Sequence, residues 1–131
     1  MPTKCVLDTN LILSAVLSYN GYPARIFDAV VDKTIKIYIS EEIVSEYKDV
    51  LSREYFKISK DKVGRTINVI RKLGIMVVHE TSNFPMKDES DRIFFDTAQS
   101  AKTWLVTGNI KHYPKKDFIV TPAGFCRKFN V

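Results

Sequence analysis

The chain alternates between short apolar runs and longer segments in which apolar residues recur every three or four positions. Short runs rich in β-branched residues predict buried strands, and the three-to-four spacing predicts amphipathic helices. The predicted strands cover residues 4–8, 35–39, 75–79, 103–107 and 118–120. The predicted helices cover residues 10–17, 23–32, 41–53, 60–73, 90–101 and 122–129. This alternation indicates βαβ crossovers, so the expected fold is a three-layer α/β/α sandwich with a mainly parallel sheet of four to five strands.

Residues that stabilise helix ends support several of these boundaries. Ser40 and Ser59 stand where an N-cap is expected, and Thr121 is followed by Pro122 at a first helical position. Gly74 follows the fourth predicted helix, where a C-cap glycine is common. The chain shows neither an internal repeat nor a low-complexity segment. We therefore expect one domain over residues 1–131.

Length and composition are those of an ordinary globular protein. A chain of 131 residues can bury a core without disulfides or structural metal, and 45% of its residues are hydrophobic. Cys5 and Cys126 lack metal-ligand spacing, which fits a reducing cytoplasm. No leader pattern precedes the first strand, and no apolar stretch approaches the roughly 20 residues that cross a bilayer. A cytoplasmic protein without a membrane partner is expected.

The charge of the chain is basic. Twenty Lys and Arg against 15 Asp and Glu give a formal charge of +5, which favours a polyanionic partner without proving one. Basic residues gather in and just before the fourth predicted helix, at Lys57, Lys60, Lys62, Arg65, Arg71 and Lys72. A solvated helix face explains most of these six residues.

Against this basic background, one carboxylate ends the first predicted strand. Asp8 follows the apolar run Cys5-Val6-Leu7. Open parallel sheets bind ligands in the crevice at the carboxyl ends of their strands. Asp8 is therefore a candidate site residue on position alone.

The third predicted helix adds a second candidate carboxylate. Glu46 borders the apolar face that includes Ile43 and Tyr47, whereas Glu41 and Glu42 occupy the first turn. Negative charge is favourable at a helix N-terminus, and this explains Glu41 and Glu42 without a site. For Glu46 the alternative to a site residue is a solvated helix residue.

Further acids cluster around the start of the fifth long helix. Asp91 stands in its first turn, where it is either a cap and dipole partner or a carboxylate facing the same sheet edge as Asp8. Asp96 follows five residues later, about 140° around the helix, so an ideal geometry does not put both on one face. Asp88 precedes this helix. Asp96 is the less certain ligand, although a charge beside Phe95 is unusual for a solvated face.

The fourth predicted strand ends in Thr107-Gly108-Asn109. Glycine after a strand allows a sharp turn, so the polar residues that follow are expected over the same edge as Asp8. Asn109 can hold a metal-bound water or a carboxylate but brings no negative charge. His112 follows, and a lone histidine is more often a surface or hydrogen-bonded residue than a catalyst.

Four motifs in this order and spacing resemble a PIN domain. They are Asp8-Thr9-Asn10, Glu46 in its helix, the segment from Asp91 to Ala98, and the Thr107-Gly108-Asn109 turn. The resemblance covers essentially the whole chain and is to PIN domains of the kind found in VapC-like toxins of prokaryotic toxin–antitoxin modules.

The resemblance implies a metal-dependent ribonuclease. By it, Asp8, Glu46 and Asp91 match an acidic site that holds Mg²⁺ or Mn²⁺ for RNA hydrolysis. Hard cations of this kind prefer carboxylate and water oxygens, and clustered carboxylates repel one another without one. The family commonly has an acid where this chain has Asn109, so Asp96 or Asp88 is expected to supply the missing charge.

Other polar residues are expected to position the substrate. The candidates for this role are Asn10, Arg92, Asn109, Lys111 and His112. Arg92 and Lys111 stand near the predicted acids and are candidate phosphate contacts. The alternative for Arg92 is a surface ion pair with Asp88 or Glu89, without a role in substrate binding.

The sequence therefore predicts an Mg²⁺- or Mn²⁺-dependent endoribonuclease, the toxin of a toxin–antitoxin pair, with RNA as substrate and a small antitoxin as partner. A homodimer is implied by the family alone. One alternative is a non-catalytic module that binds RNA or protein. A phosphatase with Asp8 as nucleophile is less expected, because such an aspartate usually has a second acid two residues later, where this chain has Asn10.

Overall fold

The computed structural model describes residues 3–131, and its centre is a five-stranded sheet in the order β3-β2-β1-β4-β5. All neighbouring strands pair in parallel. The strands are β1 (Thr3–Leu7), β2 (Ile35–Ile39), β3 (Ile75–Met76), β4 (Trp104–Val106) and β5 (Ile119–Val120). The prediction of an α/β fold with a mainly parallel sheet is confirmed.

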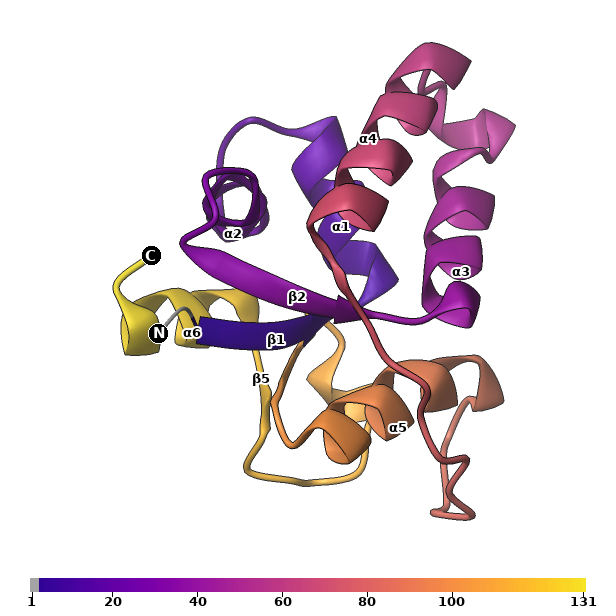
Figure 1. The fold of residues 1–131 in the computed structure, drawn as a ribbon, viewed down its shortest axis with the longest axis vertical. Helices are drawn as coiled ribbons and strands as arrows, with labels where there is room; N and C mark the ends of the chain where they lie inside the picture. Colours follow the sequence, from indigo (N-terminus) through magenta and orange to yellow (C-terminus); the bar gives the residue numbers. More distant parts are fainter. Residues whose placement is uncertain (1–2) are drawn as a thin grey trace.

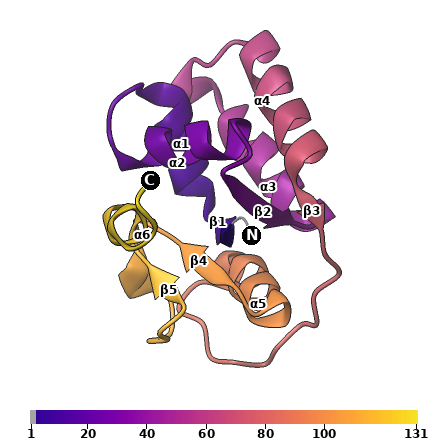
Figure 2. The ribbon, with the colours of Figure 1, turned by 60° about the vertical axis from the view of Figure 1, so that its left-hand side comes forward.

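Helices cover both faces of this sheet (Figures 1 and 2). They are α1 (Thr9–Leu17), α2 (Tyr22–Val31), α3 (Glu41–Leu51), α4 (Lys60–Leu73), α5 (Arg92–Ala101) and α6 (Pro122–Phe129). Helices α1 to α4 lie together on one side, and α6 packs against α2. Helix α5 lies on the opposite side, against β1, β2 and β4. The three predicted layers are therefore present.

The strand order creates a crevice at one place on the sheet edge. From the central strand β1 the chain moves outward to β2 and β3, and then returns to place β4 on the other side of β1. The connections that leave β1 and β4 therefore run away from each other. Parallel sheets bind ligands at such a switch point, beyond the carboxyl ends of the two strands.

The apolar faces of the helices and sheet form one continuous core. Its largest fully buried side chains include Tyr47, Phe94, Phe95 and Phe125. Tyr47 stacks near Phe94 at 6.1 Å between ring centroids, which joins α3 to α5. Both cysteines are free and lie buried in this core. Within residues 3–131, no helix combines the length and the apolar character that crossing a membrane requires.

The predicted helix caps are present, and the boundaries differ from prediction mainly around β3. The Ser40 and Ser59 hydroxyls accept hydrogen bonds from backbone N–H groups in the first turns of α3 and α4. Strand β3 spans two residues instead of the predicted 75–79. The Val77 N–H still donates to the Ile39 carbonyl (2.8 Å), but the chain then leaves the sheet, and the Glu80 N–H donates to the Ser100 hydroxyl on α5 (3.2 Å).

Two glycines, one inside α4 and one at its C-cap, give opposite predictions for substitution by alanine. A Cβ atom at Gly74 would lie 2.6 Å from Ile39 Cδ1 and 2.7 Å from the Ile70 carbonyl oxygen, so Gly74→Ala should destabilise the fold by about 2 kcal/mol. A Cβ at Gly64 would meet no atom of residues 3–131 within 4 Å, and Gly64→Ala should stabilise the fold by roughly 0.5–1 kcal/mol. Urea unfolding of both variants checks the two signs, and equal effects would contradict the packing argument.

Candidate functional site

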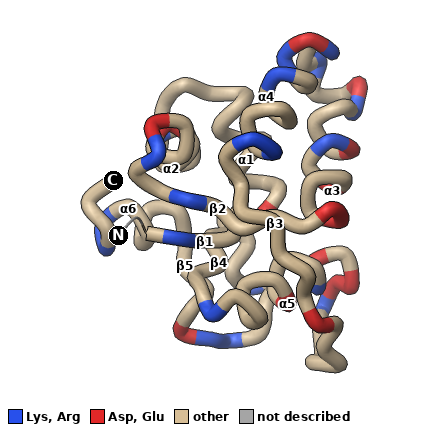
Figure 3. The backbone as a smooth tube through the Cα atoms, in the orientation of Figure 1, with Lys and Arg blue, Asp and Glu red and all other residues tan. Residues whose placement is uncertain are grey.

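Four carboxylates line one hollow of about 300 Å³ beyond the carboxyl ends of β1 and β4. We call it the acid hollow and define it by Asp8, Glu46, Asp88 and Asp91. Figure 3 shows acidic positions gathered beside the start of α5. The acids come from β1, α3 and the segment before α5, so the crevice at the switch point unites residues far apart in the sequence.

Asp8 is buried and held by the turn after β4. Its backbone N–H donates to the Val106 carbonyl (3.0 Å), and its Oδ2 accepts from the Thr107 hydroxyl (2.6 Å). The same hydroxyl oxygen accepts from the Asn109 N–H (3.0 Å), which fixes the direction in which Thr107 donates. Burial raises the pKa of Asp8, and the Thr107 hydrogen bond opposes this rise. The Thr107-Gly108-Asn109 turn therefore orients Asp8.

Glu46 is placed beside Asp8 by a hydrogen bond within the core. The hydroxyl of Tyr47, which is fully buried, donates to the backbone carbonyl of Leu7 (2.5 Å). Tyr47 follows Glu46, and Leu7 precedes Asp8, so this one bond ties the two acidic positions together. Glu46 itself is half-buried and lines the acid hollow.

Asp88 shapes the backbone at the entrance to α5. Its Oδ1 accepts from the Ser90 N–H (2.9 Å) and the Ser90 hydroxyl (2.8 Å), which caps the short 3₁₀ helix Glu89–Asp91. These hydrogen bonds lower the pKa of Asp88. Asp88 is therefore charged, exposed and fixed at the rim of the hollow.

Asp91 stands at the N-cap of α5, but among the described residues its carboxylate makes no capping hydrogen bond. Its Oδ2 is buried and has no hydrogen-bond partner within residues 3–131, and His112 Nδ1 lies 4.0 Å away. Burial raises the pKa of Asp91 to about 6, with further contributions from the charges of Asp8, Asp88 and Glu46, which the His112 charge opposes. The capping explanation for Asp91 is therefore not the one that the structure favours.

The residues of the acid hollow fit a hard divalent cation. Within the described part of the chain, no three His, Cys, Asp or Glu side chains converge closely enough to form a ready metal centre. Asp91 nevertheless lines the hollow together with the other carboxylates, and its Oδ2 has no hydrogen-bond partner among residues 3–131. Burial, and then the negative charges of these neighbours, raise the pKa of Asp91. A cation would supply the missing partner and relieve this repulsion, and carboxylate oxygens are the ligands that Mg²⁺ and Mn²⁺ prefer.

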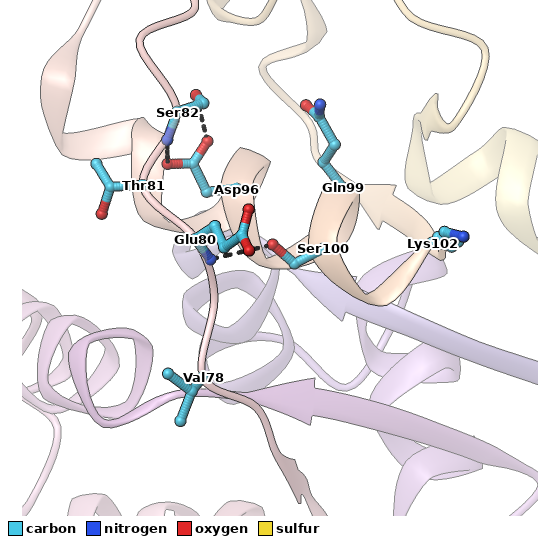
Figure 4. A pocket seen from close by; sticks show the side chains of 8 residues that line it. All are labelled: Val78, Glu80, Thr81, Ser82, Asp96, Gln99, Ser100 and Lys102. Carbon is cyan, nitrogen blue, oxygen red and sulfur yellow. Dashed lines mark hydrogen bonds between the residues drawn. The ribbon is translucent and has the colours of Figure 1, made fainter.

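Asp96 lies outside the acid hollow. Its carboxylate is 1% exposed and accepts from the Ser82 N–H (2.9 Å) and the Ser82 hydroxyl (2.6 Å). Figure 4 shows this pair beside Glu80 and Ser100, in a separate hollow of about 480 Å³. Its position argues against the expectation that Asp96 is a catalytic or metal-binding carboxylate. Instead, Asp96 holds the irregular segment after β3 against α5.

This placement predicts a structural role for Asp96. Asp96→Ala should leave the partly buried Ser82 donors without their acceptor and destabilise the fold by about 2 kcal/mol. Metal affinity per folded molecule should stay unchanged. Urea unfolding measures the first effect, and Mn²⁺ titration calorimetry below the melting temperature measures the second. Loss of Mn²⁺ binding in a folded variant would restore Asp96 as a ligand.

The expected phosphate contacts Arg92 and Lys111 also face elsewhere. The Arg92 guanidinium donates to both Glu89 oxygens (2.7 Å each), to the Ser82 carbonyl (2.8 Å) and to the Phe84 carbonyl (2.7 Å). Arg92 thus holds the segment before α5 in place through these hydrogen bonds. Lys111 lines a neighbouring hollow. Three other expected residues do line the acid hollow, namely Asn10, Asn109 and His112.

Three residues at or beside the hollow were not singled out as site residues from the sequence. Thr107 belonged to the turn motif, but nothing indicated that its hydroxyl bonds Asp8. Arg53 lines the hollow and follows Glu46 by seven residues, a spacing that puts both on one side of the helix predicted over residues 41–53, although α3 itself ends at Leu51. The Tyr113 hydroxyl is buried, and this burial, next to the charges of Asp8 and Asp91, raises the pKa of Tyr113. Of these three residues, only Arg53 had a sequence spacing that could have indicated its place at the hollow.

Comparison with solved structures supports the architecture. The crystal structure of VapBC2 from Rickettsia felis, bound to a DNA fragment from their promoter, matches with a TM-score of 0.61. The match covers 91% of this chain and 97% of that chain at 15% identity. At this identity the likeness establishes the shared fold.

Sequence comparison adds a relative and a family. Uncharacterized protein MJ1680 of Methanocaldococcus jannaschii is 27% identical over 109 residues, which cover 81% of this chain and 70% of the relative. A family model described as PIN domain matches residues 4–111, which span β1 to the residues just after the Thr107-Gly108-Asn109 turn. PIN domains are generally nucleases. The chain therefore belongs to the PIN-domain family.

Proposed function

We propose that this protein is a divalent-metal-dependent endoribonuclease that hydrolyses phosphodiester bonds in RNA. The observation that carries the proposal is the gathering of Asp8, Glu46, Asp88 and Asp91 around one hollow, where Asp91 Oδ2 has no partner within the described residues. A carboxylate cluster at a sheet switch point in a chain of formal charge +5 suits a metal-dependent enzyme with a polyanionic substrate.

Asp8, Glu46 and Asp91 would hold Mg²⁺ or Mn²⁺, with Asp88 at the rim as a further ligand. The ion, when bound, lowers the pKa of a water molecule and stabilises negative charge on phosphate oxygens. The chain's own groups keep the ligands in place: Thr107 orients Asp8, and the Tyr47 hydrogen bond fixes Glu46 beside it.

Polar groups at the rim would bind and orient the phosphate. Arg53 and His112 line the hollow with more than half of each side chain exposed, 57% and 58% respectively. Their side chains can therefore reach a substrate without first breaking buried contacts. Asn10 and Asn109 add amide donors on the same rim, and such contacts position a nucleic acid without reading its sequence.

Cleavage of single-stranded RNA tests the proposal directly. The purified protein should cut a labelled RNA when Mn²⁺ or Mg²⁺ is present and leave it intact in EDTA. The same nucleotide sequence made as DNA serves as the substrate control. RNA that stays intact at every Mn²⁺ concentration would contradict the enzymatic proposal.

A second candidate is a non-catalytic module that binds RNA or a protein partner. It is favoured by the finding that no three acidic or histidine side chains within residues 3–131 converge into a ready metal centre. Manganese titration separates the two, because the enzyme should bind the ion through its carboxylates. Absence of both Mn²⁺ binding and cleavage, with RNA binding intact, would favour this second candidate.

We further propose that the protein acts in the cytoplasm as the toxin of a toxin–antitoxin pair. The support is the shared fold with the Rickettsia felis VapBC2 structure. On this proposal a small antitoxin covers the toxin, and a second copy of this chain completes a homodimer. Co-expression with the product of the adjacent open reading frame tests the pairing, since a stable complex should copurify and suppress cleavage.

Substitution of Asn109 tests whether a further carboxylate in the acid hollow would strengthen metal binding. Asn109→Asp should strengthen Mn²⁺ binding, because a carboxylate would replace a neutral amide on the rim. Isothermal titration calorimetry of the two proteins measures the change. Unchanged or weaker affinity would mean that the Asn109 side chain does not reach the ion.

A further inference from the structure

A second hollow of about 630 Å³ shares a wall with the acid hollow. The wall is the 3₁₀ helix η3 (Ile110–His112): His112 lines the acid hollow, whereas Ile110 and Lys111 line the second. We call the second one the basic hollow and define it by its four lysines, Lys87, Lys111, Lys115 and Lys116. It lies along the connection between β4 and β5, which carries basic positions beside an acidic one in Figure 3.

The four lysines leave their charge unneutralised. Within residues 3–131 none of them makes an ion pair, and the sole acid lining the basic hollow is Asp117. Lys87 Nζ donates to the Lys111 carbonyl (2.9 Å), and Lys116 Nζ lies 4.6 Å from the ring centre of Phe84. These contacts hold two ammonium groups in place without cancelling their charge.

The remaining lining of the basic hollow is largely apolar. Ile110 is 41% exposed, and Pro114, Ile119 and the ring of Tyr113 complete the wall. Positive charge above an apolar wall suits single-stranded nucleic acid, whose backbone follows the charge while an unpaired base covers apolar surface. Double-stranded nucleic acid would keep its bases away from such a wall.

Helix α4, the most basic segment of the sequence, is less suited to this role. Arg65 pairs with Asp61 (3.1 Å), and Arg71 makes two bonds of 3.1 Å to Glu41. Neither helix α4 nor its basic residues line the acid hollow. A strand bound there would not continue directly into the site.

We propose that the basic hollow binds the single-stranded RNA backbone next to the phosphate held in the acid hollow, with an unpaired base against the apolar wall. The proposal rests on the proposed function, and it names a substrate path that the acid hollow alone does not give. The path also offsets the repulsion between the substrate and the acidic cluster, because the lysines lie across a single wall from the carboxylates.

A charge-matched pair of triple variants tests this path. The test variant carries Lys111→Ala, Lys115→Ala and Lys116→Ala, and it keeps Lys87 because that side chain holds the Lys111 carbonyl. The control removes three exposed lysines from α3 and α4, namely Lys48, Lys60 and Lys72. Both variants lose the same charge, and melting curves establish that both fold.

Fluorescence anisotropy in EDTA measures binding without cleavage. The probe is a labelled single-stranded RNA of about 12 nucleotides, a length in the range that single-strand sites cover. The test variant should bind about tenfold more weakly at low salt, and its slope of log affinity against log salt should fall by about 2. The control variant should keep nearly the parental slope. Equal losses in both variants, or an unchanged slope in the test variant, would overturn the proposal.

Two further measurements distinguish this proposal from binding of an acidic protein partner and from the enzymatic proposal. If the test variant keeps RNA binding but loses binding to a poly-glutamate peptide, the basic hollow serves an acidic protein partner and the RNA path is wrong. If the parent shows no Mn²⁺-dependent cleavage while the slope still falls in the test variant, the enzymatic proposal fails and the RNA path stands. If the parent cleaves RNA in the presence of Mn²⁺ but the salt slope of the test variant is unchanged, the enzymatic proposal stands and the RNA path is wrong.

Discussion

Asp8→Asn should reduce Mn²⁺-dependent RNA cleavage by about a thousandfold or more while the fold stays intact. Asp8 is the most buried acid of the acid hollow, and the Thr107 hydroxyl holds one of its oxygens. The variant keeps the shape of the side chain but removes the charge that a cation requires. Because burial raises the pKa of Asp8, its charged form is unfavourable without metal, and the melting temperature in EDTA should be unchanged or higher.

The control for this variant is Asp28→Asn, the same chemical change at an exposed position of α2. It should leave cleavage at the parental rate. Single-turnover cleavage of labelled RNA measures both variants. Parental activity in Asp8→Asn would remove Asp8 from the site, and a lower melting temperature would show that the Thr107 contact stabilises the fold more than burial of the charge destabilises it.

The stability of the metal-free protein should fall as pH rises from about 4 to 7, and Asp91 should account for much of this fall. The folded state raises the pKa of Asp91 from 3.8 to about 6, so the folded protein binds its proton more tightly than the unfolded chain does. The resulting stabilisation is complete below pH 4 and is lost as pH rises through 6. A shift of this size corresponds to at most about 3 kcal/mol, and the Asp91 side chain is only 17% exposed.

Urea unfolding in EDTA at several pH values measures this effect for the parent and for Asp91→Asn. The difference between the two profiles isolates Asp91 from other groups, and the variant should show the flatter profile. Adding Mn²⁺ at pH 7 should restore stability in the parent and much less in the variant, since a cation bound only to the folded state stabilises it. Parallel pH profiles would mean that folding does not raise the pKa of Asp91.

The fold could be predicted from sequence because local patterns and topology agreed. Apolar runs marked the strands, and serines marked the starts of α3 and α4. The short length of β3 could not be predicted from the sequence. The chain leaves the sheet because Glu80 contacts Ser100 on α5, and this contact depends on tertiary structure. Such a contact leaves no periodic signal in the strand itself.

The candidate site could be predicted in part. The sequence indicated Asp8 by its place at the end of a predicted strand and Asp91 by its place in the first turn of a predicted helix. In a parallel sheet, strand ends and helix starts meet at one edge. Asp96 and Arg92 could not be placed, since their partners lie in the irregular segment around Ser82. A segment without periodicity gives no indication of which side chains it will contact.

The position of β1 in the middle of the sheet also bears on how the protein is made. Chains emerge from the ribosome with the N-terminal part first. Strand β1 can pair with β2 early, but its other side stays open until β4 has been synthesised. The Thr107 hydroxyl reaches Asp8 only then, so a nascent or prematurely ended chain that stops before β4 lacks the contact that orients Asp8 and one side of the crevice. We therefore expect the proposed RNA cleavage to begin only after synthesis has passed residue 107.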